Sequence, residues 1–131
     1  MAGLVVLDAS VLIAYLKRSD EHHARARGAV SEARDSNLAA STMTFAEVLV
    51  APARANRLAA VRTVLNRLEV GEVPFPGDAA ARLATIRARS GLKLPDCCVL
   101  LAAEDAGAES ILTFDANLAA AARAAGFGTA S

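Results

Sequence analysis

Short apolar runs alternate along the chain with longer segments whose apolar residues recur at helical spacing. The short runs have the β-branched composition and the bounding turn signals of buried parallel strands. We expect strands over residues 3–8, 38–41, 69–73 and 110–113, and a fifth, edge strand could follow Phe127. The longer segments predict helices at residues 10–17, 20–33, 44–55, 58–68, 78–90, 95–106 and 115–125.

Proline and glycine residues between these segments support the predicted ends of the helices. Pro95 stands in the first turn of a predicted helix, while Gly91, Gly107 and Gly126 follow the ends of three others. Strands that alternate with helices are typical of an α/β fold with a parallel sheet. No linker, repeat or block of charge interrupts the pattern, so we expect residues 1–131 to form one domain.

Composition narrows the class of protein. Apolar residues make up 54% of the 131 residues and aromatic residues only 4%, which predicts an aliphatic core and excludes disorder. The longest apolar runs, at 11–16 and 97–103, are far shorter than the ~18 residues of a membrane span. The N-terminus lacks the basic region of a secretory signal. Adjacent Cys97 and Cys98 suit neither a zinc knuckle nor an ordinary disulfide, so we expect a reduced, cytoplasmic protein without a membrane partner.

Charge is a weak guide to the partner. The formal net charge is zero, although 12 of the 14 basic residues are Arg, which suits bidentate phosphate contacts. A GC-rich genome would also favour Arg. Arg82 and Arg89 share a predicted helix face, with Arg87 and Lys93 nearby in sequence, and could follow an RNA backbone; a plain solvated face explains them as well.

Four acidic residues occupy related positions in the predicted fold. Asp8 ends the first strand, and Asp115 directly follows the fourth. Glu47 is expected in the first turn of the helix after the second strand, and Asp96 near the start of the helix opened by Pro95. Active sites of parallel sheets lie outside the carboxyl ends of the strands, where these acids are expected to gather.

Each acid taken singly has a structural explanation. Asp8 and Asp115 could be helix N-caps. Thr44 and Glu47 fit a T-x-x-E capping box, and Asp96 could complement a helix dipole.

Taken together, the acids indicate a metal site. Carboxylates ~5 Å apart repel each other by about 3 kcal/mol per pair at an effective dielectric constant of ~20, unless a cation lies among them. Oxygen ligands without nearby Cys or His favour Mg²⁺ or Mn²⁺. The chemistry that follows is hydrolysis of a phosphodiester by metal-activated water.

The motifs DASVLIAYL, STMTFAEVL, LKLPDCCVLLAAEDAGAESILTFD and ANL resemble a PIN-domain ribonuclease, in particular the VapC-type toxins of bacterial type II toxin–antitoxin modules. The similarity covers nearly the whole chain in order. It implies a PIN-like three-layer sandwich, with a parallel sheet of four or five strands flanked by helices. It also implies a homodimer, a Mg²⁺ or Mn²⁺ cofactor, an RNA substrate, and a cognate antitoxin of which a segment enters the active-site groove.

The resemblance assigns roles to individual residues. The family's catalytic acids correspond to Asp8, Glu47, Asp96 and Asp115, of which Asp8, Asp96 and Asp115 would hold the metal. Ser10 matches the family's hydroxyl two residues after the first acid and would orient ligands or phosphate. Some members carry a further acid where this chain has Asn117, which puts a second metal in doubt.

The remaining candidate residues favour structural roles. His22 and His23 lack a placed partner in sequence, and Cys97 and Cys98 are expected to be small packing residues. Tyr15 is the only tyrosine and there is no Trp, so a base-stacking platform is poorly supported.

Two other functions stay open. A phosphatase of the haloacid dehalogenase class also begins with a strand that ends in Asp, but it needs a second Asp where this chain has Ser10. A PIN-like module could also bind a partner without cleaving RNA, although all four acids are present.

Overall fold

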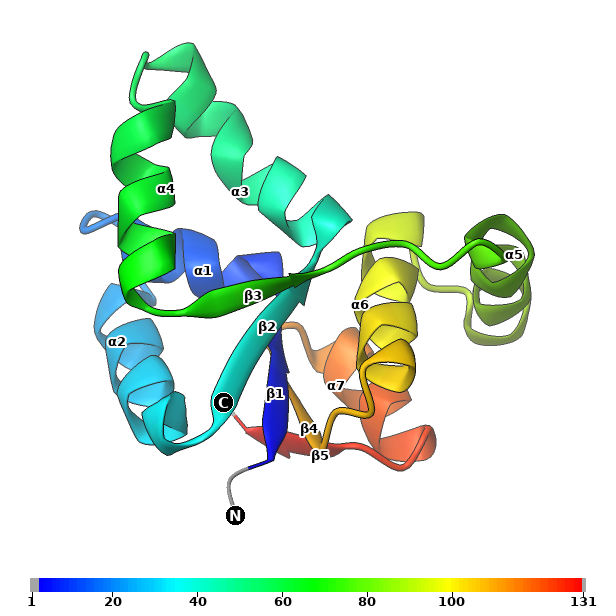
Figure 1. Cartoon of the computed structure of the whole chain (residues 1–131). Helices are drawn as coiled ribbons and strands as arrows, with labels where there is room; N and C mark the ends of the chain where they lie inside the picture. The colour runs from blue at the N-terminus through cyan, green and yellow to red at the C-terminus, as the bar shows by residue number, and fades with distance from the viewer. Residues whose placement is uncertain (1–2, 131) are drawn as a thin grey trace.

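A computed structural model describes residues 3–130 as a five-stranded parallel sheet flanked by seven α-helices (Figure 1). The strands are β1 (Leu4–Leu7), β2 (Asn37–Ser41), β3 (Val70–Val73), β4 (Ser110–Leu112) and β5 (Gly128–Ala130). The helices are α1 (Ala9–Leu16), α2 (His23–Glu32), α3 (Thr42–Arg54), α4 (Leu58–Arg67), α5 (Ala79–Ser90), α6 (Leu94–Asp105) and α7 (Ala116–Ala124). The α/β prediction is confirmed, including the edge strand after Phe127.

The first strand of the chain is the middle strand of the sheet. The order is β3-β2-β1-β4-β5, and every neighbouring pair is parallel. Val5 pairs with Leu38 of β2 on one side, and Val6 pairs with Ile111 of β4 on the other. A central strand buried on both faces needs a continuous apolar sequence, which the LVVL of β1 provides.

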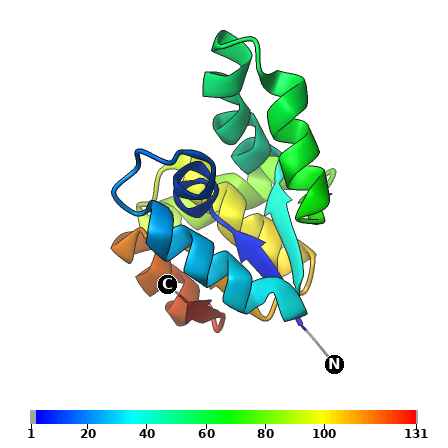
Figure 2. The same ribbon diagram turned by 90° about the vertical axis from the view of Figure 1, so that its left-hand side faces the viewer.

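Alternate side chains of β1 enter two different cores. Val5 and Leu7 join the core formed with α1 and α2, which also includes Leu65 of α4. Val6 joins the core formed with α6 and α7 on the opposite face. Figure 2 shows α1 and α2 in front of the sheet with α6 behind it. The molecule is therefore the three-layer sandwich that the family resemblance implied.

Helices α3 and α4 contribute Val48 and Leu65 to the core with α1 and α2, and their far ends extend away from the layers. They pack against each other and project beyond the carboxyl ends of the strands (Figure 1). The lower part of α3 contacts both α1 and α6, so it bridges the two helical layers at this end of the sheet. Side chains on α3 and α6 can therefore meet those that follow the strands.

The helix predicted over 20–33 begins later than expected, at His23. The Asp20 carboxylate accepts a hydrogen bond of 2.8 Å from the His22 N–H, which holds these residues in a turn before the helix. The helix ends at Glu32, and a 3-10 turn (Ala33–Asp35) follows it.

The predicted capping box of Thr44 and Glu47 is wrong. Ser41 caps α3 instead, since its hydroxyl accepts a hydrogen bond of 3.1 Å from the Thr44 N–H. Because the helix begins at Thr42, Glu47 lies in its second turn and not in its first. Glu47 is thereby left without a capping role.

Within residues 3–130, no helix combines the length and the apolarity needed to cross a bilayer.

Candidate active site

The sheet reverses its order of connection beside β1. From β1 the chain moves outward through β2 and β3, and later returns to the other side of β1 with β4. Parallel sheets bind ligands at such a switch point, outside the carboxyl ends of the strands. Asp8 follows β1 here, and its N–H donates to the Leu112 carbonyl at 3.0 Å. This bond places Asp8 beside the residues that follow β4.

Asp8 is buried, with 7% of its surface exposed, and both carboxylate oxygens accept hydrogen bonds. The Ala9 N–H donates to Oδ1 at 2.8 Å, as expected of an N-cap. The hydroxyls of Ser10 and Thr113 both donate to Oδ2, each at 2.8 Å. Four hydrogen bonds, counting its own N–H, therefore fix the position of this carboxylate.

Thr113 is a residue that the sequence reasoning missed. Its buried hydroxyl donates to Asp8 and accepts a hydrogen bond of 3.0 Å from the Asp115 N–H. Ser10 acts in parallel, since its hydroxyl donates to Asp8 and accepts from the Phe114 N–H at 3.2 Å. The two hydroxyls thus connect Asp8 to the segment that contains Asp115. The signal in the sequence was the polar Thr at the end of an apolar strand.

Asp115 caps α7. Its Oδ1 accepts hydrogen bonds from the N–H groups of Asn117 at 2.8 Å and Leu118 at 3.0 Å. The structural explanation is therefore correct for this residue, but it uses one carboxylate oxygen only, and the side chain is exposed. Asn117 is exposed too, and contributes its backbone N–H to this cap.

Glu47 and Asp96 come to the same place from α3 and α6. Partial burial of the carboxylate raises the pKa of Glu47 above its ordinary value, and the charges of Asp8 and Asp96 raise it further. Burial likewise raises the pKa of Asp96, with further contributions from Asp8 and Asp115, against a smaller lowering by Lys93. The four predicted acids therefore act on one another electrostatically, as a cluster does.

The chemistry of the donors suits a hard divalent cation. The cluster offers carboxylate oxygens as ligands. Its negative charges repel one another, and a bound cation would reduce this repulsion. Among the described residues, no three His, Cys, Asp or Glu side chains are close enough as they stand to hold a metal ion. The residues fit such an ion by charge and donor type.

The two cysteines lie inside the fold. Cys97 and Cys98 are 0% and 2% exposed, and neither forms a disulfide. Burial raises the pKa of the Cys97 thiol. Burial also raises the pKa of Cys98, followed by the charges of Cys97 and Glu47. Both residues are buried packing residues, as the sequence suggested, and Cys98 is close enough to Glu47 to feel its charge.

The histidines separate into different environments. His23 Nδ1 is hydrogen-bonded to the Ala14 carbonyl at 2.8 Å, which supports the predicted structural role. The His22 ring lies against Phe114, with 5.7 Å between ring centroids. The guanidinium of Arg25 lies over the same ring, 4.2 Å from its centroid.

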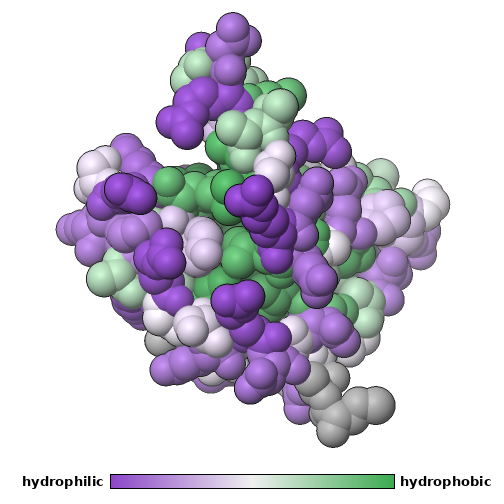
Figure 3. All heavy atoms as spheres, turned by 60° about the vertical axis from the view of Figure 1, so that its left-hand side comes forward, coloured by the Kyte–Doolittle hydropathy of each residue, from purple (hydrophilic) through white to green (hydrophobic). Residues whose placement is uncertain are grey.

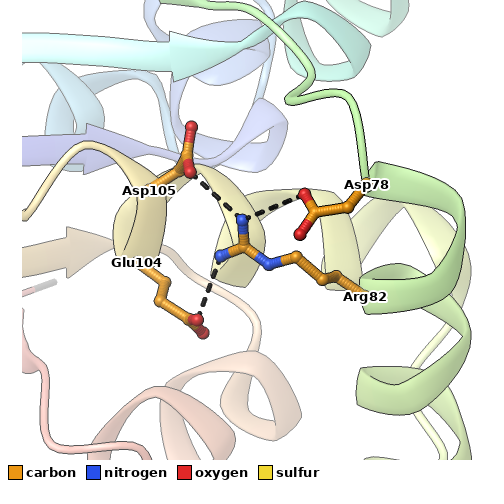
Figure 4. A network of polar contacts seen from close by, with 4 residues as sticks. All are labelled: Asp78, Arg82, Glu104 and Asp105. Atoms are coloured by element: carbon orange, nitrogen blue, oxygen red, sulfur yellow. Dashed lines mark hydrogen bonds and ion pairs between the residues drawn. The ribbon is translucent and has the colours of Figure 1, made fainter.

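Arg82, a candidate for following RNA, is engaged by acids of its own chain (Figure 4). Its guanidinium contacts Glu104 at 3.0 Å, Asp105 at 3.1 Å and Asp78 at 3.5 Å. Arg87 donates to the Leu92 carbonyl at 2.7 Å. These contacts tie α5 to α6 and favour a structural role for both arginines.

An apolar groove lies beside Glu47, between α1 and the α3–α4 pair. Its volume is about 430 Å³, and its lining includes Ile13, Val48, Val61 and Val64. Figure 3 shows apolar surface gathered at the base of the α3–α4 projection. The acid cluster thus adjoins a surface suited to an apolar partner.

Comparison with known proteins agrees with this architecture. VapC20 of Mycobacterium tuberculosis, a toxin that cleaves the sarcin–ricin loop, superposes with a TM-score of 0.74 at 16% identity, over 95% of this chain and 96% of that one. A toxin–antitoxin complex from Klebsiella pneumoniae gives 0.70 at 24% identity, over 88% of this chain and 90% of the matched chain. No curated protein sequence matches. The model of the PIN domain matches residues 5–124, and the chain therefore belongs to the PIN domain family.

Proposed function

We propose that residues 1–131 form a single PIN domain that cleaves RNA as the toxin of a toxin–antitoxin pair. The observation that carries this proposal is the convergence of Asp8, Glu47, Asp96 and Asp115 at the switch point of the sheet. The resemblance in fold to VapC toxins supports the same conclusion.

In this proposal Asp8, Asp96 and Asp115 hold Mg²⁺ or Mn²⁺, and Glu47 holds a water or the metal's hydration shell. The bound metal supplies an activated water and stabilises the leaving oxygen of the phosphodiester. Asp8 is oriented by the hydroxyls of Ser10 and Thr113, so it is the fixed member of the set. Asp115 keeps Oδ2 outside its capping bonds and can use it as a ligand. Asn117 would orient substrate near α7.

The test uses purified chain with total cellular RNA, with Mg²⁺, Mn²⁺ or chelator present. We expect metal-dependent cleavage that Asp8→Asn and Asp115→Asn both abolish, with circular dichroism like that of the wild type. The matched control is Asp35→Asn, which changes an exposed acid at the opposite end of the sheet. Metal-independent cleavage would contradict the mechanism. Binding of a partner without any cleavage would favour the non-catalytic module.

The phosphatase alternative is less well supported. The second Asp that it requires is replaced by Ser10, whose hydroxyl is already bonded to Asp8 and to the Phe114 N–H. Membership of the PIN family also points away from the dehalogenase class.

We propose an antitoxin as the protein partner, in accord with the resemblance to a toxin–antitoxin complex. An apolar segment of it would occupy the groove beside Glu47, and an Arg would reach Asp8, Asp96 or Asp115, because a guanidinium pairs well with carboxylates. Replacing that Arg by Ala should weaken the complex by about 2–5 kcal/mol. Inhibition that does not depend on Mg²⁺ concentration would contradict this competition.

A homodimer is the proposed assembly. Phe75 and Leu94 are apolar side chains with 41% and 48% of their surface exposed, and a second copy could cover them. Light scattering of the wild type and of Leu94→Glu would test this assembly, since the variant should shift the chain toward monomer.

A further inference from the structure

Arg25 and His22 cover a residue that belongs to the acid site. Phe114 separates Thr113 from Asp115, and its N–H is bonded to the Ser10 hydroxyl. The Arg25 guanidinium lies 4.2 Å from the centre of the Phe114 ring, and the His22 ring lies 5.7 Å from it. A cation therefore lies over the ring of the residue that joins Thr113 to Asp115, on the side of the sheet where Phe114 packs against the core formed with α1 and α2.

Arg25 is also free of acidic partners. It is exposed and makes no ion pair with any residue in the described range 3–130. Arg82, by contrast, is surrounded by three carboxylates. A cation held over an aromatic ring keeps its charge and gives up none of its N–H donors to an acid. Arg25 is thus available to an anion from outside the molecule.

The negative charge of the acid cluster gives such a cation a role in binding RNA. Four ionised carboxylates with one divalent ion still carry a net negative charge, which repels a phosphate backbone approaching the site. The chain as a whole has no excess of positive charge to overcome this repulsion. A positive group outside the metal ligands, held over a residue next to Asp115 in sequence, would offset this repulsion.

We propose that Arg25, held on Phe114, binds a phosphate of the RNA next to the one that is cleaved. The proposal rests on the ribonuclease function above and adds a substrate-binding residue to it. The planar guanidinium suits bidentate contact with phosphate oxygens, and the ring fixes its position before the strand arrives. His22 packs on the same ring and limits the movement of the pair.

The experiment measures binding of a labelled single-stranded RNA of mixed sequence by fluorescence anisotropy, in chelator and over a range of salt concentrations. We expect Arg25→Gln to weaken binding about tenfold, as loss of one charged hydrogen-bonding group would. The slope of log K against log salt should fall by about 0.7, the value for one phosphate contact on a single strand. With Mg²⁺ present, KM should rise while kcat changes little.

Arg27→Gln is the matched control. Arg27 lies on the same helix, and its guanidinium is 5.4 Å from the Tyr15 ring, so the variant removes the same charge from a similar contact outside the site. We expect it to bind RNA like the wild type. Arg25→Lys should restore only part of the affinity, because Lys lacks the planar fork. Thermal melts of each variant show whether the fold is retained.

Several results would overturn the proposal. Wild-type affinity in Arg25→Gln would do so, and so would an equal loss in Arg27→Gln, which would indicate a general effect of charge. Full recovery in Arg25→Lys would contradict the bidentate contact, because Lys keeps the charge and lacks the planar fork. Unchanged RNA binding with weakened antitoxin binding would assign Arg25 to the protein partner. In all these cases wild-type cleavage stands; a wild-type chain that neither binds nor cleaves RNA would overturn the proposed function as well.

Discussion

Asp8 has a structural role as well as its place in the candidate site. Its carboxylate caps α1 and accepts the hydroxyls of Ser10 and Thr113, so its orientation is set by the polypeptide alone. Within residues 3–130, the carboxylates of Asp96 and Glu47 accept no such hydrogen bonds, and burial together with neighbouring charge raises the pKa of each. The Asp8 carboxylate is thus held by hydrogen bonds, whereas the ionised forms of Asp96 and Glu47 are destabilised by burial and by neighbouring negative charge.

This difference predicts how stability depends on pH. The pKa of Asp96 is raised above its ordinary value of 3.8, so the folded state holds that proton more tightly than the unfolded state. The carboxylate therefore destabilises the fold as the pH rises through the window above 3.8, and the full cost is present beyond the raised pKa. We expect Asp96→Asn in chelator to melt no lower than the wild type at neutral pH. The difference should shrink as the pH falls toward the ordinary value.

Calorimetry of both proteins at several pH values would check this expectation, with Asp35→Asn as the exposed control. An Asp96→Asn variant that melts well below the wild type in chelator would instead show that the fold needs this carboxylate.

The buried thiols give a second prediction. Because burial raises the pKa of Cys97 and Cys98, both are protonated and shielded at neutral pH. Iodoacetamide should label native protein slowly and urea-unfolded protein at both sites, as mass spectrometry can count. The double variant Cys97→Ser, Cys98→Ser should retain most of its RNA cleavage. Loss of cleavage in a folded double variant would show that the four acids are not sufficient.

The roles of single residues were only partly visible in the sequence. The acids stood out because they interrupt apolar segments or directly follow strands, and in the structure Asp8 influences the pKa of both Glu47 and Asp96, while Asp115 influences that of Asp96. Thr113 did not stand out, since its partner Asp8 is 105 positions away. The acidic partners of Arg82 on α6 are 22 and 23 positions away, and no local pattern reveals them.

Among the helices, α3 has the most specific task. It carries Glu47 into the site from a starting point fixed by Ser41, whose side chain is 2% exposed. The Ser41 hydroxyl contacts both the N–H of Thr44, at 3.1 Å, and its hydroxyl, at 3.3 Å. This buried cap determines where the helix begins, and so which turn presents Glu47.

Ser41→Ala should therefore reduce the free energy of unfolding by about 1 kcal/mol, within the usual range of ~0.5–2 for loss of an N-cap. Urea titration followed by circular dichroism would measure the change. Thr63→Ala is the control, because that exposed hydroxyl bonds only to the Ala59 carbonyl within its own helix. Equal losses in the free energy of unfolding from the two substitutions would show that the Ser41 cap contributes no more than an ordinary exposed hydroxyl.

The elements themselves were predicted well, and their starts less well. Strands such as LVVL can be recognised by their β-branched, apolar composition. Gly91 ends α5 with a positive φ of 73°, as expected of a glycine at the end of a helix. The start of α3 was misplaced because Ser41 and Thr44 are both good caps by composition. Only the packing of Thr44 inside the fold, at 0% exposure, decides between them.

The sheet gathers these elements into one electrostatic unit. The sequence predicted a parallel sheet but not its strand order, because several orders satisfy the same local pattern. The observed order places β1 between β2 and β4, which brings Asp8 beside the loop that carries Asp115. A cation bound there would connect side chains from both helical layers.

Metal binding should consequently stabilise the whole fold. We expect the melting temperature of the wild type to rise with Mg²⁺ or Mn²⁺, following RT ln(1 + [M]/Kd), which reaches about 2.7 kcal/mol at 100 times Kd. Asp96→Asn should lose most of this rise, and Asp35→Asn should keep it. A wild-type melting temperature that is constant over millimolar metal would contradict a functional site.

The central position of β1 also has a consequence for the order in which the protein is made. Residues at the beginning of the chain leave the ribosome first, yet Asp8 gains its Thr113 hydrogen bond only after β4 has been synthesised. Contacts between distant parts of a chain form late in folding. A growing chain therefore carries the first acid of the site long before the segment that orients it exists. The acid cluster is completed only after β4 and the segment that follows it have been synthesised, so we expect a chain that stops before β4 to lack the complete site.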